Sequence, residues 1–217
     1  MAARQGFPGL PPQSMIELTH YLADFLRPVY ELIKKEVQAS RVLHADETPH
    51  KMLEGSPRKN WYLWGFSNAT ACYFECHDSH SGDIATNFLN ESSCEILISD
   101  IYAGYNKALR QANKIRKAEG RVAILPAFCN AHARRKLRDL PGISGEKYTR
   151  YYGKIYHLCK QLPLLNHESQ SEIRKEIASV FEKIYRNCEQ DKELFPLNSD
   201  PQRYLKYFTK KIGRAHV

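Results

Sequence analysis

The order of strand-like and helix-like segments in the middle of this chain constrains its fold more than any other feature. Between positions 41 and 140, short apolar stretches alternate with longer stretches whose apolar residues recur every three or four positions. We expect strands at 41–48, 60–66, 71–77, 95–99 and 121–128, and helices at 81–89, 103–118 and 130–140. The turn-like "SNAT" joins the second and third strands as an antiparallel hairpin. A hairpin beside helix-linked strands predicts an α/β fold, a mixed sheet with helices on its faces.

Helical patterns lie on both sides of this central region. The capping-box pair Ser14 and Glu17 predicts the start of a helix that runs to about Gln38 and is kinked at Pro28. The pattern from 141 to 210 is helical throughout. We therefore divide the chain into an N-terminal lead-in and helix (1–40), a core (41–140) and a helical region (141–211).

Composition places the chain among globular proteins. Of its 217 residues, 42% are hydrophobic and 26% are charged, which is ordinary for a domain with a packed core. No run of 18 apolar residues is present, and the N-terminus lacks the pattern of a signal peptide. We expect a cytoplasmic protein without a membrane partner, in which the six cysteines are reduced thiols.

The net charge of +8 is concentrated in one segment. Between Tyr105 and Arg138 the chain has ten Lys or Arg residues and a single acid, Glu119, whereas the remainder is close to neutral. A local basic surface is what binding to a phosphate backbone needs. A solvated helix face explains the charge equally well.

Two of the expected strands end in an acid. Asp46 closes "VLHAD", and Asp100 follows the strand at 95–99, which its three aliphatic residues predict to be buried on both faces. If the two strands are parallel neighbours, both carboxylates emerge at one edge, where they repel unless a cation lies between them. Mg²⁺ and Mn²⁺ prefer such oxygen ligands and support phosphodiester transfer. The alternative is that Asp46 caps a turn before Pro49, where the first strand is expected to stop, and that Asp100 caps a helix.

Further candidates for chemistry follow Asp100. In "CNAHARRK" we expect His132 near a reaction centre, and Arg134, Arg135 and Lys136 on phosphates. Tyr102 and Tyr105 could stack on bases, or pack the following helix against the sheet. A less favoured zinc site would use a loose set of thiols and imidazoles: Cys72, Cys76, His77, His80, Cys129 and His132.

Four motifs in register, "LHADETP", "YLWGF", "SDIYAGYN" and "CNAHARRKL", resemble those of the insertion-sequence-66 family of bacterial DDE transposases. The resemblance covers about 41–140 and implies an RNase H-like core, with Asp46 and Asp100 as metal-binding catalytic acids and Mg²⁺ or Mn²⁺ as cofactor. It implies transposition of an insertion sequence, in which transposon ends are cleaved and joined to target DNA. Partners would be that DNA, further copies of the chain and accessory proteins of the element.

The chain departs from the family pattern in what surrounds these motifs. The N-terminal zinc-binding and DNA-binding segments and the third catalytic Glu are not recognised, so we expect this fragment to be nearly inactive alone. The tail 212–217, "IGRAHV", is also encoded by one reading frame of a common sequencing adapter, so we expect it to be non-native. Two alternatives stay open: a non-catalytic basic DNA-binding module, and another RNase H-like nuclease.

Overall fold

A computed structural model describes residues 11–52, 60–100 and 102–209. The expected tail at 212–217 lies outside the described residues. These form two compact units. The first runs to Ile98 and continues from Tyr102 to Pro126, and the second contains Ser99, Asp100 and the chain from Ala127 onward. Within the described ranges, no helix combines the length and the apolar composition needed to cross a membrane.

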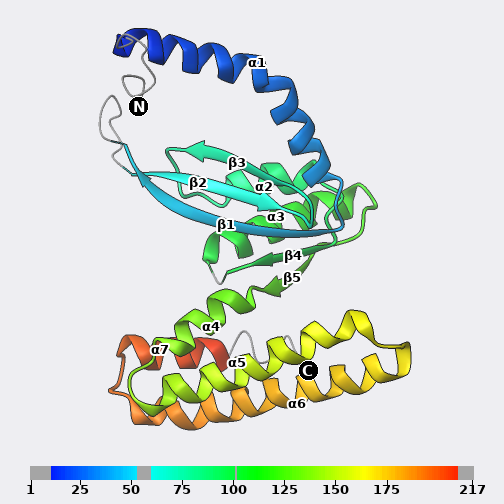
Figure 1. The fold of residues 1–217 in the computed structure, drawn as a ribbon, viewed down its shortest axis with the longest axis vertical. Coiled ribbons are helices and arrows are strands. Elements are labelled where there is room, and N and C mark those ends of the chain that lie inside the picture. Colours follow the sequence, from blue (N-terminus) through cyan, green and yellow to red (C-terminus); the bar gives the residue numbers. More distant parts are fainter. Residues whose placement is uncertain (1–10, 53–59, 101, 210–217) are drawn as a thin grey trace, which may run out of the picture. The chain divides into compact units, whose positions relative to one another are not determined.

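The sheet has five strands in the order β3-β2-β1-β4-β5 (Figure 1). Their bounds are Val42–Lys51 for β1, Asn60–Ser67 for β2, Cys72–His77 for β3, Ile96–Ser99 for β4 and Leu125–Phe128 for β5. Strands β1 and β2 are antiparallel, and so are β2 and β3, as the hairpin prediction requires.

The other half of the sheet is parallel. At the start of β4, the backbone N–H of Ile96 donates to the carbonyl of Arg41, directly before β1. At the start of β5, the N–H of Leu125 donates to the carbonyl of Glu95, directly before β4. Because starts pair with starts, β1, β4 and β5 run in the same direction. The predicted mixed sheet is therefore confirmed.

Two strand boundaries differ from the prediction. Pro49 does not end β1 but pairs with Tyr62, and the strand continues to Lys51. Strand β4 has only four residues and starts level with Arg41, so the far end of β1 behaves as an edge, where proline is tolerated.

Strand β5 is shorter than the expected 121–128 because a side chain takes over its first backbone hydrogen bonds. The amide group of Asn113 accepts from the N–H of Ile124 at 2.7 Å and donates to its carbonyl at 2.9 Å. The ladder therefore begins only at Leu125.

Two helices, α2 (Asp83–Asn90) and α3 (Ala103–Ala118), cover one face of the sheet (Figure 1). The core between them is apolar and aromatic, and the rings of Phe66 and Phe88 stack at 3.9 Å. Helix α3 has the predicted bounds, and Gly120 follows it with a φ of 70°. Glycine adopts this conformation without the steric cost that a Cβ brings, which explains why the helix ends here.

Helix α1 (Pro12–Gln38) contains Pro28 and bends along its length (Figure 1). The predicted capping box is wrong: the N-cap is Pro11, no side chain caps the helix, and Pro12 occupies the first helical position, where its fixed φ suits a helix start. The hydroxyl of Tyr30 donates to the carbonyl of Phe74 at 2.8 Å, which joins the C-terminal half of α1 to β3.

The second unit is helical after β5, as predicted for 141–210. Its helices are α4 (Asn130–Arg138), α5 (Ile143–Gln161), α6 (His167–Asp191) and α7 (Asp200–Tyr207), with 3₁₀ turns at Leu162–Leu164 and Lys192–Leu194. Their shared core includes Leu137, Tyr148, Tyr152, Ile184 and Phe208. Helix α4 contributes to this core, so it belongs with the helical unit.

Candidate functional site

Asp46 stands on the face of the sheet opposite to α2 and α3. Leu43 and Ala45 on the same strand are buried in the core of the first unit, while Asp46 is exposed. Successive side chains of a strand point to opposite faces, so the alternation places the Asp46 carboxylate on the face that those helices leave uncovered.

The residue opposite Asp46 on the neighbouring strand is a glycine. Gly65 is its cross-strand partner on β2 and in turn faces Phe74 on β3. A Cβ at position 65 would lie 3.0 Å from the Phe74 ring, tighter than ordinary contact, so the ring packs over the glycine. Gly65 itself therefore adds no side chain next to Asp46, and the Phe74 ring of β3 covers the glycine.

Asp100 directly follows β4, which the strand order places next to β1. The two strands are parallel, so the neighbouring strands assumed in the carboxylate prediction are present. Asp100 is half-buried. The expectation that β4 is buried on both faces is wrong, because Ile96 is 37% exposed while Leu97 is buried. Ile96 lies on the face opposite to α2 and α3, as Asp46 does.

The described residues contain no cluster of three His, Cys, Asp or Glu side chains placed to hold a metal ion. The zinc alternative gains nothing from the structure, since His77 lies 2.9 Å from a Glu75 oxygen and His80 lies 3.1 Å from a Glu47 oxygen. Asp46 and Asp100 are carboxylates on neighbouring parallel strands, and their oxygens are of the type that Mg²⁺ and Mn²⁺ prefer.

The two tyrosines of "DIYAGYN" are engaged within the protein. Tyr105 is 2% exposed, and its hydroxyl donates to Glu47 at 2.6 Å. The Tyr102 ring stacks on His80 at 4.1 Å, and its hydroxyl donates to the His80 carbonyl at 2.5 Å. Of the two roles left open by the sequence, these contacts favour packing over base stacking.

Sequence reasoning missed Glu47 and His80 as members of this site. The available signal was the tandem acid pair Asp46-Glu47 in a strand, because alternation turns one of the two acids toward the core, where it needs donors. The donors that Glu47 finds, His80 and Tyr105, lie 33 and 58 positions away, so nothing local identifies them.

The basic segment divides into structural and exposed residues. Arg116 is 2% exposed and donates to the backbone carbonyls of Cys94, Ser92, Leu89 and Val122. By contrast, three residues spaced along α3 are exposed and form one row: Arg110, Lys114 and Lys117. Their spacing of four and three positions places them on one side of the helix.

The four candidate residues of "CNAHARRK" all lie on α4 in the second unit: His132, Arg134, Arg135 and Lys136. Arg135 and Lys136 are exposed, while His132 and Arg134 are half-buried. The Arg134 guanidinium lies 5.8 Å from the centre of the Tyr156 ring, which holds it against α5. Arg135 and Lys136 are therefore the members of this set that can reach a partner without rearrangement.

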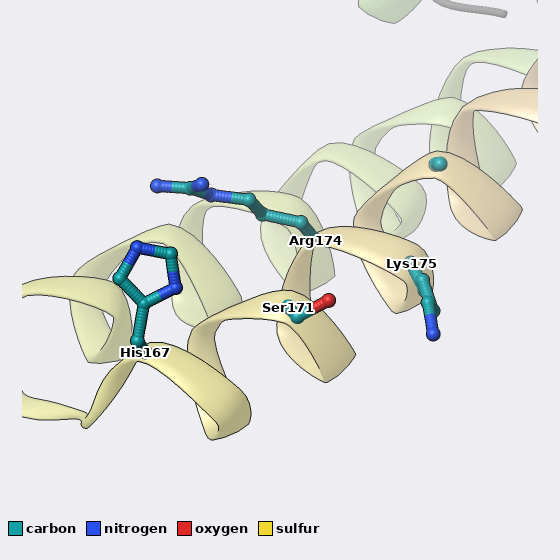
Figure 2. Close-up of a pocket in the computed structure, with 5 residues that line it drawn as sticks. His167, Ser171, Arg174 and Lys175 are labelled. Carbon is teal, nitrogen blue, oxygen red and sulfur yellow. The ribbon is translucent and has the colours of Figure 1, made fainter.

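A shallow hollow runs along α6 and is lined by His167, Ser171, Arg174, Lys175 and Ala178. Three of the five, His167, Arg174 and Lys175, can carry positive charge, but their side chains do not converge on a common point. In Figure 2 the Arg174 side chain runs in the direction of His167, whereas the Lys175 side chain points away from both. The hollow is a less suitable site than the sheet face at Asp46.

Comparisons with known proteins indicate a protein family for this chain. The family model described as "Transposase IS66 family" matches residues 1–215. A relative in Sinorhizobium fredii, "Uncharacterized protein y4hP", is 22% identical over 229 aligned residues, which cover 93% of this chain and 40% of that protein. The chain thus spans about two fifths of the length of that relative.

Proposed function

We propose that this chain, which belongs to the IS66 family of transposases, supplies Asp46 and Asp100 as two catalytic carboxylates for DNA cleavage and strand transfer. The observation that carries the proposal is the sheet itself. Asp46 lies on β1 and Asp100 follows β4, and these strands are parallel neighbours.

An RNase H-like fold is part of this proposal. Three parallel strands and an antiparallel hairpin in the order β3-β2-β1-β4-β5 support it, together with helices on one face of the sheet. In such a fold, the neighbouring parallel strands β1 and β4 carry the two acids, and the antiparallel strands β2 and β3 extend the sheet beyond β1.

Asp46 and Asp100 would hold the divalent cation, Mg²⁺ or Mn²⁺, that the family implies. When bound, such a cation stabilises negative charge on the oxygens of a phosphodiester during displacement. Asp46 is exposed on the face opposite to α2 and α3, so a phosphate group would approach its carboxylate from that face. The residues present fit the ion in ligand chemistry, and further ligands would come from outside this pair.

The DNA substrate would contact exposed basic side chains. On α3 these are Arg110, Lys114 and Lys117, and on α4 they are Arg135 and Lys136. Arg and Lys neutralise phosphates without reading sequence, so this contribution is expected to be non-specific and sensitive to salt. His132 and Arg134, which are half-buried, are proposed to support the α4 surface, while Arg135 and Lys136 make the direct phosphate contacts.

The test is Mn²⁺-dependent nicking of DNA carrying the element's ends, by an IS66-family transposase that contains this segment. Asp46→Asn and Asp100→Asn should each abolish nicking while DNA affinity stays within about twofold, because the acids would hold the cation and the basic side chains would supply the phosphate contacts. Asp83→Asn, an exposed acid at the start of α2, is the matched control and should nick normally.

The same assay separates the alternatives. Full nicking by Asp46→Asn would refute the catalytic proposal and favour a non-catalytic DNA-binding module. Nicking that depends on both acids but ignores the element's ends would favour another RNase H-like nuclease.

A further inference from the structure

Glu47, the residue after Asp46, is enclosed on the opposite face of β1. Its side chain is 9% exposed, Oε2 accepts from the Tyr105 hydroxyl at 2.6 Å, and Oε1 lies 3.1 Å from Nε2 of His80. A carboxylate buried to this degree is stable only when donors satisfy it. Two adjacent acids in one strand therefore have opposite environments, one enclosed and one open.

His80 is held from three sides. Its ring lies between the rings of Tyr62 at 4.2 Å and Tyr102 at 4.1 Å, with interplanar angles of 5° and 9°. The Tyr102 hydroxyl also donates to the backbone carbonyl of His80. The stack joins β2, the segment before α2 and the start of α3 in one contact.

Two glycines allow these segments to approach closely. A Cβ on Gly82 would lie 2.3 Å from the carbonyl oxygen of Gly104, and a Cβ on Gly104 would lie 2.2 Å from the Tyr102 ring. Neither position accepts a larger residue without moving backbone or ring. The start of α3 is therefore seated directly against the segment that carries His80.

We propose that Glu47, His80, Tyr102 and Tyr105 form a clamp that positions Asp46. The clamp ties β1 to the start of α3, which begins three residues after Asp100 in the chain. Its members are positioning residues, because they act through the strand. The proposal rests on the function proposed above for Asp46.

Strand geometry explains why Asp46 needs such a clamp. A slip of one residue in a strand moves every side chain to the opposite face, and here it would exchange Asp46 with Glu47. The short strand β4 does not extend alongside the far end of β1, so that end pairs only with β2 among the described strands. Because Glu47 is enclosed on one face of β1, the Asp46 side chain is held on the other face. The enclosure acts next to the end of β1 that has only one neighbouring strand among those described.

The same sheet supplies a matched control. Glu75 on β3 accepts from the Tyr73 hydroxyl at 2.5 Å and lies 2.9 Å from Nε2 of His77. It therefore makes the same pair of contacts, with a tyrosine and a histidine, but two strands away from β1. Loss of Glu75 costs similar local interactions without touching the clamp.

The experiment compares Glu47→Ala and Glu75→Ala by amide hydrogen exchange and by Mn²⁺ binding. Glu47→Ala should raise exchange about tenfold or more both at 45–49 and at 102–106 and lower Mn²⁺ affinity about 10- to 100-fold, the range seen when a group supporting a metal ligand is removed. Glu75→Ala should leave both segments unchanged and Mn²⁺ affinity within about twofold. Unchanged exchange at 102–106 in Glu47→Ala would overturn the clamp, and so would equal Mn²⁺ affinity in the two variants when Asp46→Asn does lower that affinity.

Failure of the proposed function is recognised separately. If Asp46→Asn binds Mn²⁺ as tightly as the unaltered chain, the metal site is refuted, while hydrogen exchange still decides whether the clamp exists. Should Glu47→Ala fail to fold, Tyr105→Phe removes one hydroxyl and keeps the ring. It should raise exchange at 45–49 and weaken Mn²⁺ binding a few-fold, and an unchanged variant would refute the clamp.

Discussion

Arg116 and Lys117 are neighbours in the basic segment, and we predict opposite consequences when each is replaced by Ala. The Arg116 guanidinium is buried and donates to carbonyls in the last turn of α2, between α2 and β4, and before β5. Lys117 is exposed on α3. Arg116→Ala should therefore destabilise the first unit, whereas Lys117→Ala should weaken DNA binding and leave stability unchanged.

The magnitude for Arg116→Ala follows from its hydrogen bonds. Nη1 lies 2.6 Å from the Cys94 carbonyl, and Nη2 lies 2.6 Å from the Ser92 carbonyl and 3.1 Å from that of Leu89. A hydrogen bond to a charged group contributes about 1.5–3 kcal/mol, and the carbonyls left buried carry a desolvation cost. Allowing for non-additivity, the loss should be at least about 4 kcal/mol in the free energy of unfolding, a large part of a typical domain's stability.

The assay is urea denaturation followed by Trp fluorescence, since Trp64 is fully buried in the same core. Lys117→Ala, at an exposed helix position, should stay within about 0.5 kcal/mol of the unaltered chain. Arg116→Lys keeps the charge but reaches fewer carbonyls, so its stability should fall between the two. An Arg116→Ala chain as stable as the unaltered one would refute the structural role and return Arg116 to the DNA-binding set.

Three further predictions follow from the same geometry. The double change Lys114→Gln and Lys117→Gln should weaken binding to any DNA sequence and reduce the slope of log affinity against log salt by about one unit per lost contact, which titrations at several salt concentrations measure. Burial raises the pKa of the Cys94 thiol to about 11 and that of Cys188 to about 12, so both stay protonated at pH 8. Iodoacetamide should alkylate the exposed thiols of Cys72, Cys76 and Cys159 before these two, and mass spectrometry showing early modification of Cys94 would contradict this. Asp191 accepts from Tyr148 at 2.8 Å and pairs with Lys147, so Asp191→Asn should cost about 3 kcal/mol of unfolding free energy, while Asp200→Asn, almost fully exposed, should cost nothing measurable by urea denaturation.

The parts of the fold that depend on local pattern could be predicted from the sequence. Helix α3 has the expected bounds because an amphipathic repeat is closed by Gly120 in a conformation that favours glycine. The hairpin of β2 and β3 also follows from alternation around a turn, where Asn68 Oδ1 accepts from the backbone N–H groups of Thr70 and Ala71.

The parts that depend on distant partners could not be predicted. Pro49 was expected to end β1, but whether a strand tolerates proline depends on how far its neighbour extends. Strand β5 begins late because Asn113, on the preceding helix, takes the hydrogen bonds of Ile124. Basic residues carry no local mark that separates a buried guanidinium such as Arg116 from an exposed one.

For the candidate site, the sequence suggested the two acids but not the residues that surround them. Asp100 directly follows β4 as predicted, but Asp46 lies within β1 (Val42–Lys51) and not at its end, because the strand continues past Pro49. The parallel strand order agrees with the arrangement on which their pairing was predicted. The roles of Glu47 and His80 appear only when β1, β2 and the start of α3 are seen together.

The central claim is that Asp46 and Asp100 together bind the same divalent cation. The most direct measurement is paramagnetic broadening of amide NMR signals by substoichiometric Mn²⁺, which reports only groups close to the ion. We predict that the amides of Asp46, Gly65 and Asp100 broaden together, and that either Asp46→Asn or Asp100→Asn alone removes the broadening at all three positions. Broadening around one acid that persists when the other is replaced would contradict a shared site.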